Sequence, residues 1–121
     1  MHFLTDLYQF NHTLAFRTGA ASGLDWSPPT DVYETEEAFV VTLELAGVDH
    51  KALQIRFLHD TLTLSGERSD PAKPASVRYA QLEINYGPFR KEIRFALPIE
   101  RQAISARCRE GLLKVVLPKA R

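Results

Sequence analysis

Histidine and cysteine are the side chains most often used for metal binding and nucleophilic chemistry, and this chain has few of them. It contains one cysteine and four histidines, and no spacing among them brings three ligands onto one metal ion. Cys108 lies between two arginines, which would favour the reactive thiolate of an exposed cysteine. The strand pattern instead predicts that Cys108 faces the core. We expect the histidines to be solvated residues; they are His2, His12, His50 and His59.

Other catalytic signatures are not found in the sequence. Its serines fall in turns or at outward strand positions, without the strained, glycine-flanked setting of a nucleophile elbow. The six glycines are isolated, and none opens a helix after a strand as a phosphate-binding loop requires. We therefore expect a protein that is not an enzyme and that uses no cofactor and no metal.

Length and composition describe one ordinary globular domain with a tail. The chain has 121 residues, of which 45% are hydrophobic, and its 15 basic residues balance its 15 acidic ones. This neutrality argues against a nucleic-acid partner. No apolar run is long enough to span a membrane, and the first residues lack the basic start and cleavage site of a secretory leader. We expect a cytoplasmic protein.

The zero net charge hides an asymmetry between the two halves of the chain. Residues 1–60 carry 3 basic and 9 acidic side chains, a net charge of −6, whereas residues 61–121 carry 12 and 6, a net charge of +6. Two interpretations are open. Strands from both halves can interleave their charges in one domain, or complementary patches can meet across a subunit interface and set its orientation.

Residues 1–25 are interpreted as an N-terminal aromatic arm with a linker. Apolar residues recur there at alternating spacings of four and three, which fits one stripe on a short helix. Such a short helix is marginal in water unless it docks on something. It either folds onto its own domain or contacts other chains. The residues of the arm that we expect to contact other protein chains are Phe3, Leu7, Tyr8, Phe10, Leu14 and Phe16.

From Asp31 onward apolar and polar residues alternate, as in half-buried strands. The turns at His59-Asp60 and Glu110-Gly111 predict hairpins, and the prolines within 66–77 predict an exposed excursion. Strands without intervening helices pair antiparallel and cover each other. The sequence therefore predicts an all-β, immunoglobulin-like antiparallel β-sandwich of seven to eight strands over 26–121. The segments with strand character are 39–45, 53–57, 61–65, 78–84, 89–97, 104–108 and 112–117.

Within the segment 89–97, one set of side chains is predicted to face inward. Phe89, Ile93, Phe95 and Leu97 belong to this set, and Lys91 is predicted to break this inward register. Pro98 is predicted to end the strand.

The strands are separated by an ordered series of short motifs. These are Trp26-x-Pro28, Asp31-Val32-Tyr33-Glu34, Glu44-Leu45-Ala46-Gly47-Val48, Leu62 to Arg68, Tyr86-Gly87-Pro88-Phe89, Leu97-Pro98 and Gly111 to Lys119. The series resembles the alpha-crystallin domain of the small heat-shock proteins, in the bacterial type. The resemblance implies an ATP-independent holdase that binds partly unfolded clients, prevents their aggregation under stress and passes them to ATP-driven refolding chaperones. The alternative is a co-chaperone or structural adaptor that uses the same sandwich to bind one specific partner.

The resemblance also implies a homodimer in which a strand on a long loop is swapped into the neighbouring sandwich. The segment 66–86 is long enough to carry that strand, and the alternative is a hairpin folded back on its own subunit. The family often places an arginine two residues beyond the position of Phe89, where this chain has Lys91. The implied dimer-interface residues are Arg78, Tyr79, Gln81, Leu82, Glu83, Arg90, Lys91 and Arg94.

The family's C-terminal extension normally fills a groove on a neighbouring dimer, and this sequence ends at Ala120-Arg121 without one. We therefore expect a homodimer or small homo-oligomer with an open groove, and a truncated chain is the alternative explanation. The groove residues expected to bind clients are Ile55, Phe57, Ile104 and Ala106.

Overall fold

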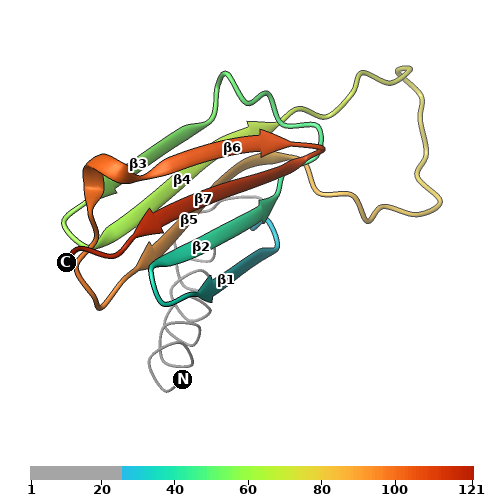
Figure 1. The fold of residues 1–121 in the computed structure, drawn as a ribbon. Helices are drawn as coiled ribbons and strands as arrows, with labels where there is room; N and C mark the ends of the chain where they lie inside the picture. The colour runs from blue at the N-terminus through green and yellow to red at the C-terminus, as the bar shows by residue number, and fades with distance from the viewer. Residues whose placement is uncertain (1–25) are drawn as a thin grey trace.

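The computed structural model describes residues 26–121, which form two antiparallel sheets that face each other (Figure 1). The first sheet has the strand order β1-β2-β7-β6 and the second has the order β3-β4-β5. The predicted β-sandwich is confirmed, and the N-terminal arm lies outside the described residues. The elements are β1 (Thr30–Glu34), β2 (Ala38–Glu44), β3 (Gln54–Leu58), β4 (Thr61–Arg68), β5 (Gly87–Arg94), the 3-10 helix η1 (Arg101–Ala103), β6 (Ser105–Arg109) and β7 (Leu112–Pro118).

The core lies between the sheets and follows from the alternation of side chains. In β2, for example, Phe39, Val41 and Leu43 are fully buried and face the second sheet. Burying this apolar surface is the main stabilising contribution to such a fold. Buried residues of the other elements complete the core: Trp26, Val32, Leu45, Leu62, Leu64, Phe89, Ile93, Phe95, Leu113, Val115 and Leu117.

Two tight turns form where the sequence predicts them. His59, between β3 and β4, has φ of 59°. Between β6 and β7, Glu110 and Gly111 have φ of 52° and 80°. Positive φ at both residues of a two-residue loop matches the twist of the strands that it joins. Both predicted hairpins are confirmed by the strand pairing.

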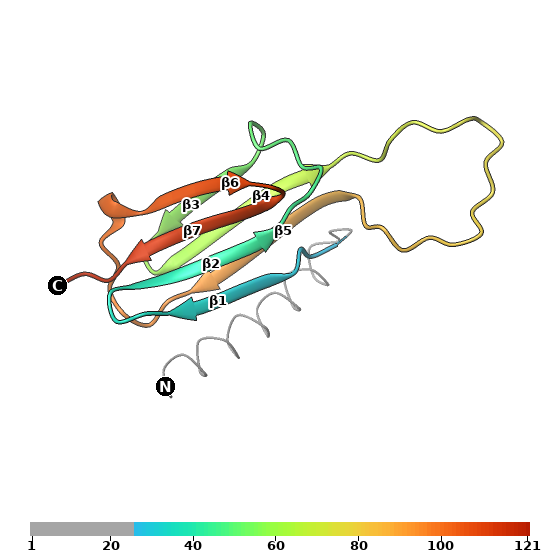
Figure 2. The ribbon, with the colours of Figure 1, turned by 45° about the vertical axis from the view of Figure 1, so that its right-hand side comes forward.

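The two long sides of the sandwich differ. Along one side, Trp26 fills the gap beside β5: its ring lies 5.4 Å from the Phe89 ring, and its indole nitrogen donates a hydrogen bond of 2.8 Å to the Gly87 carbonyl. Along the other side run the edge strands β3 and β6, one from each sheet (Figures 1 and 2). The segment that precedes β1 therefore closes one side of the sandwich.

The expected burial of Cys108 is wrong. Its register partner on β7 is the buried Leu113, so Cys108 does face the inner side of the sheet. It is nevertheless exposed, as are all five residues of β6. The reason is that β6 is an edge strand, and the alternation of side chains does not tell an edge from a centre.

The expected inward position of Leu97 is also wrong, since 38% of this residue is exposed. Strand β5 ends at Arg94, and the last backbone hydrogen bond joins the Phe95 amide to the Asp60 carbonyl at 2.8 Å. The chain then leaves the sheet before Pro98. The prediction that Lys91 breaks the inward register is wrong as well. Lys91 is buried on the same face of β5 as Phe89 and Ile93.

The segment 78–84 does not form a strand in this single chain. β4 continues to Arg68, further than expected, and residues 69–86 form an exposed loop without regular structure. A strand needs a neighbour for its backbone hydrogen bonds, and this segment pairs with no described strand. Within 26–121 no helix is long and apolar enough to cross a membrane.

Candidate interaction surfaces

The side of the sandwich between β3 and β6 combines apolar side chains with open strand edges. Ile55 is 38% exposed, whereas Phe57 and Ile104 are partly buried against the core. Ala106 is exposed on β6. Within residues 26–121 each edge strand pairs with only one neighbour, so half of its backbone donors and acceptors face outward. The structure thus brings the four predicted groove residues to one side of the fold.

The positively charged side chain of Arg101 lies near Phe57, at one end of this side. The Arg101 guanidinium carbon is 5.6 Å from the centre of the Phe57 ring. A cation over an aromatic face is attracted by the ring quadrupole, and it leaves the ring edge available to an apolar group. The arm residues expected to act with this side, Phe3 to Phe16, lie outside the described residues.

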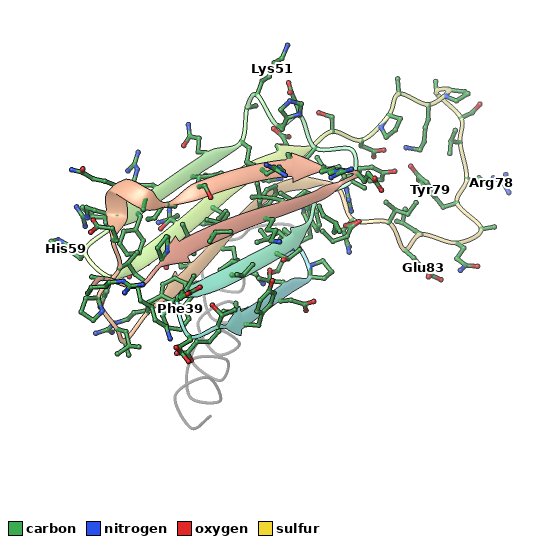
Figure 3. All side chains as sticks on the ribbon, in the orientation of Figure 1. Phe39, Lys51, His59, Arg78, Tyr79 and Glu83 are labelled. Carbon is green, nitrogen blue, oxygen red and sulfur yellow. The ribbon has the colours of Figure 1, made fainter. Side chains whose placement is uncertain are left out.

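The loop 69–86 extends away from the sandwich and carries unburied apolar side chains. Figure 3 shows Arg78, Tyr79 and Glu83 on this loop, at the end of the molecule opposite His59. Tyr79 is 51% exposed, Leu82 67% and Ile84 65%. Gln81 is also exposed and hydrogen-bonds to Glu83. So much exposed apolar surface on an extended segment is typical of a region that a partner covers.

Arg68 anchors the loop at its base. Its Nε donates a hydrogen bond of 2.8 Å to the Asn85 carbonyl, and its Nη1 donates one of 2.9 Å to the Ala46 carbonyl. The guanidinium also lies 4.2 Å from the centre of the Trp26 ring. One side chain therefore ties the two ends of the loop to each other and to the end of β2. Sequence reasoning missed it, because its partners lie 17 and 22 residues away.

The three basic residues of β5 do not form one surface. Arg90 and Arg94 lie on the outer face, where Arg90 pairs with Glu92 at 2.7 Å and Arg94 pairs with Asp60 at 3.0 Å. Lys91 lies on the inner face, is 6% exposed and donates a hydrogen bond of 2.9 Å to the Ser27 hydroxyl. Burial lowers the pKa of Lys91 below its usual 10.5.

The outer face of the second sheet contains a polar hollow of about 690 Å³. His59 and Asp60 both border it, but the Asp60 carboxylate accepts hydrogen bonds from Thr61 and Arg94. Partial burial raises the pKa of Asp60, and the contacts with Thr61 and Arg94 outweigh it, so the pKa lies below 3.8. Because its oxygens are already engaged, Asp60 is not arranged to orient His59 as a base. Among residues 26–121 no group of three histidine, cysteine or acidic side chains could hold a metal.

The first sheet has a free edge at β1. Among the strands of the described part of the chain, this one pairs with β2 alone, and its Tyr33 is 44% exposed. An unpaired edge of this kind can accept another strand.

The sequence of this chain is similar to those of known proteins. Residues 31–121 match the family model described as "Hsp20/alpha crystallin family". The chain is 28% identical to "Small heat shock protein C2" of Rickettsia felis, over 91% of this chain and 71% of that protein. It is also 28% identical to "Spore protein SP21" of Stigmatella aurantiaca, over 76% of this chain and 54% of that protein.

A solved structure shares both sequence and fold. Heat shock protein 16.0 from Schizosaccharomyces pombe is 32% identical and has a TM-score of 0.70. The superposition covers 79% of this chain and 68% of that one. The two facing sheets and the family match over 31–121 agree. This chain belongs to the Hsp20/alpha crystallin family of small heat shock proteins, and this membership supports a chaperone role.

Proposed function

We propose that this protein is an ATP-independent holdase, which binds partly unfolded proteins and prevents their aggregation under stress. The observation that carries the proposal is the open side between β3 and β6, where Ile55, Phe57 and Ile104 meet two unpaired strand edges. The aromatic arm, with Phe3, Tyr8, Phe10 and Phe16, supplies further apolar contacts.

The chemistry of this side suits an unfolding client. Folding intermediates expose apolar side chains and unpaired strand edges. An extended client segment can hydrogen-bond to the edge of β3 or β6 and place alternate side chains against Ile55 and Phe57. Because main-chain hydrogen bonds do not depend on sequence, such a side binds many clients. Bound clients are then released to ATP-driven refolding chaperones in the cytoplasm.

The working unit in this proposal is a homodimer. In it the segment 78–84 of each chain becomes a strand and pairs with the free edge of β1 in the other chain. Tyr79, Leu82 and Ile84 are then covered, and Arg68 fixes the point from which the loop departs. Arg90, midway along β5, contributes to the same interface, and so does Arg94, at the end of β5 away from the loop.

The client site is tested by two substitutions on one strand. Ile55→Ser removes an apolar side chain from the open side. Leu58→Ser is the matched control, because Leu58 is 58% exposed on the same strand but faces the outer surface. Heat-induced aggregation of several unrelated proteins is followed by light scattering, without ATP.

The proposal requires that wild type and Leu58→Ser suppress the aggregation of several clients, and that Ile55→Ser needs a higher chaperone concentration. Protection of only one client would instead indicate an adaptor for a specific partner. Equal protection by the two variants would place the client site elsewhere.

A further inference from the structure

The outer face of the first sheet carries a graded row of charges. The strand register places Arg107 of β6 opposite Lys114 of β7, Lys114 opposite Thr42 of β2, and Thr42 opposite Asp31 of β1. Like charges directly opposite each other destabilise a strand pair. The ion pairs of residues 26–121 give neither Arg107 nor Lys114 a carboxylate partner. The β6 end of the row therefore lacks a counter-charge, and the β1 end offers one.

The neighbouring row on the same face has a hollow at one end and a protruding ring at the other. This row runs from Ser105 through Val116 and Val40, which is only 5% exposed, to Tyr33. Tyr33 is 44% exposed. A hollow of about 300 Å³ lies over the β6 end of both rows, and it is lined by Ser105, Ala106, Arg107, Lys114 and Val116.

A two-fold axis parallel to the strands makes these two rows complementary to themselves. When two copies meet face to face about such an axis, each row of the second copy lies over the same row of the first copy. Its residues then run in the reverse order. Asp31 of the second copy then lies opposite Arg107, and Tyr33 of the second copy lies opposite Ser105, over the hollow. Sheets that pack face to face keep their strands within about 30° of each other, so the rows stay matched near the axis. Self-complementarity is what a symmetric two-fold interface requires.

We infer that this outer face binds the same face of a second copy of the chain, with Asp31 and Tyr33 of each copy set against Arg107 and the hollow of the other. The contact does not use the free edge of β1, and of the groove residues on the side between β3 and β6 it reaches only Ala106, which lines the hollow. It would therefore join swapped dimers into larger assemblies while leaving Ile55, Phe57 and Ile104 of the proposed client site open. A four-strand face is small, so the contact is weak, and salt screens its exposed charges.

The test uses charge reversals in the full-length chain. Arg107→Asp sets two carboxylates against each other across the interface, and Asp31→Arg sets two guanidiniums against each other. The double variant restores both pairs with reversed signs. In a mixture of the two single variants, each mixed contact has one reversed pair and one wild-type pair. Arg56→Asp is the control, because Arg56 is exposed on the outer face of the other sheet. Association is followed by sedimentation velocity over a range of concentrations at about 0.05 M and about 0.5 M salt.

The expected result at low salt is that each single reversal raises the concentration for half-association of dimers about tenfold, as the loss of one good ionic contact would. The double variant should return to the wild-type value, and the control should not change it. The mixture should associate more strongly than either single variant alone, because only its mixed contacts are complementary. Disturbance of the swapped strand by Asp31→Arg would not be rescued at position 107. Single variants that associate like wild type, or a double variant no better than the singles, would overturn the inference. A double variant that associates no better than the single variants would assign the face to another occupant, such as the N-terminal arm or a client.

Discussion

The Lys91 ammonium lies 2.9 Å from the Ser27 hydroxyl and has no carboxylate partner within residues 26–121. The residue is 6% exposed and stands between the buried Phe89 and Ile93 on the inner face of β5. A buried ammonium with a single neutral partner loses its hydration without a compensating charge. The contact orients the segment before β1, and we expect the burial of the ammonium to lower the stability of the fold.

Replacing this ammonium by an apolar group of similar length should stabilise the domain. We expect Lys91→Met to raise the free energy of unfolding at neutral pH by about 1 kcal/mol, because the desolvation cost disappears. The measurement is urea denaturation followed by tryptophan fluorescence, since Trp26 lies beside Phe89. Lys51→Met, at an exposed lysine outside the strands, is the control and should change stability little. A marked loss of stability in Lys91→Met would contradict the account.

The same lysine predicts a dependence of stability on alkaline pH. Burial lowers the pKa of Lys91 in the folded state below the 10.5 of the unfolded chain. Between these two values the unfolded chain binds more protons, so the contribution of Lys91 makes the protein more stable as pH rises toward 10.5. Below the folded pKa the full penalty remains. The difference in unfolding free energy between Lys91→Met and wild type should therefore shrink across this window, and a constant difference would rule out the lysine as its origin.

Arg68 should control the order of the loop 69–86. Removing its guanidinium in Arg68→Ala deprives the Asn85 and Ala46 carbonyls of their donor and Trp26 of its stacked cation. Hydrogen bonds from a charged group contribute about 1.5–3 kcal/mol each, so we expect a loss of about 2 kcal/mol. Amide hydrogen exchange should accelerate near residues 85–87. Arg56→Ala on an exposed strand position serves as the comparison, and equal exchange in the two variants would show that the loop base is held by other contacts.

Gly66 of β4 lies close to the side chains of Phe89 and Leu53. A Cβ atom built at this position would lie 3.0 Å from the Phe89 ring and 3.3 Å from the Leu53 side chain. Gly66→Ala should therefore destabilise the domain by about 1–3 kcal/mol through overpacking. Thermal unfolding of this variant beside Ser65→Ala, one residue away, checks the expectation. An unchanged melting temperature would mean that the Phe89 ring moves aside without cost.

The proposed dimer predicts a specific effect of loop substitutions. Leu82 is 67% exposed in the single chain, so Leu82→Arg should leave the monomer fold intact. Covering this position in the dimer would bury an unpaired charge. The Leu82→Arg dimer should therefore dissociate already at protein concentrations at which the wild-type dimer stays intact. Light scattering after size exclusion measures the mass, and Ala72→Arg, at an exposed position near the start of the loop, is the control. Dimers of unchanged strength in Leu82→Arg would indicate an interface without the loop.

The sequence predicts the elements of this fold well because their causes are local. Alternation marked Phe39, Val41 and Leu43 as core residues, and both predicted turns, at His59 and at Glu110-Gly111, have the expected backbone. Errors arose where burial depends on distant neighbours. Cys108 faces inward on an edge that the other sheet does not cover.

The interaction surfaces were harder to predict than the strands. The residues between β3 and β6 could be named in advance only through a resemblance, which supplies the pairing of distant strands. The anchoring role of Arg68 and the burial of Lys91 depend on the segments that contain Ala46 and Ser27, which no local pattern connects to them. The apolar residues at 79, 82 and 84 were found as a strand pattern, but the single chain leaves that segment unpaired.

The most direct test of the account asks where an unfolding client touches this protein. A photo-crosslinking residue is placed at position 55 or at position 58, and each protein is heated with a client and irradiated. The account predicts strong client crosslinks from position 55, on the open side between β3 and β6, and few from position 58 on the opposite face of the same strand. Equal crosslinking from the two positions, or crosslinking from position 58 alone, would contradict it.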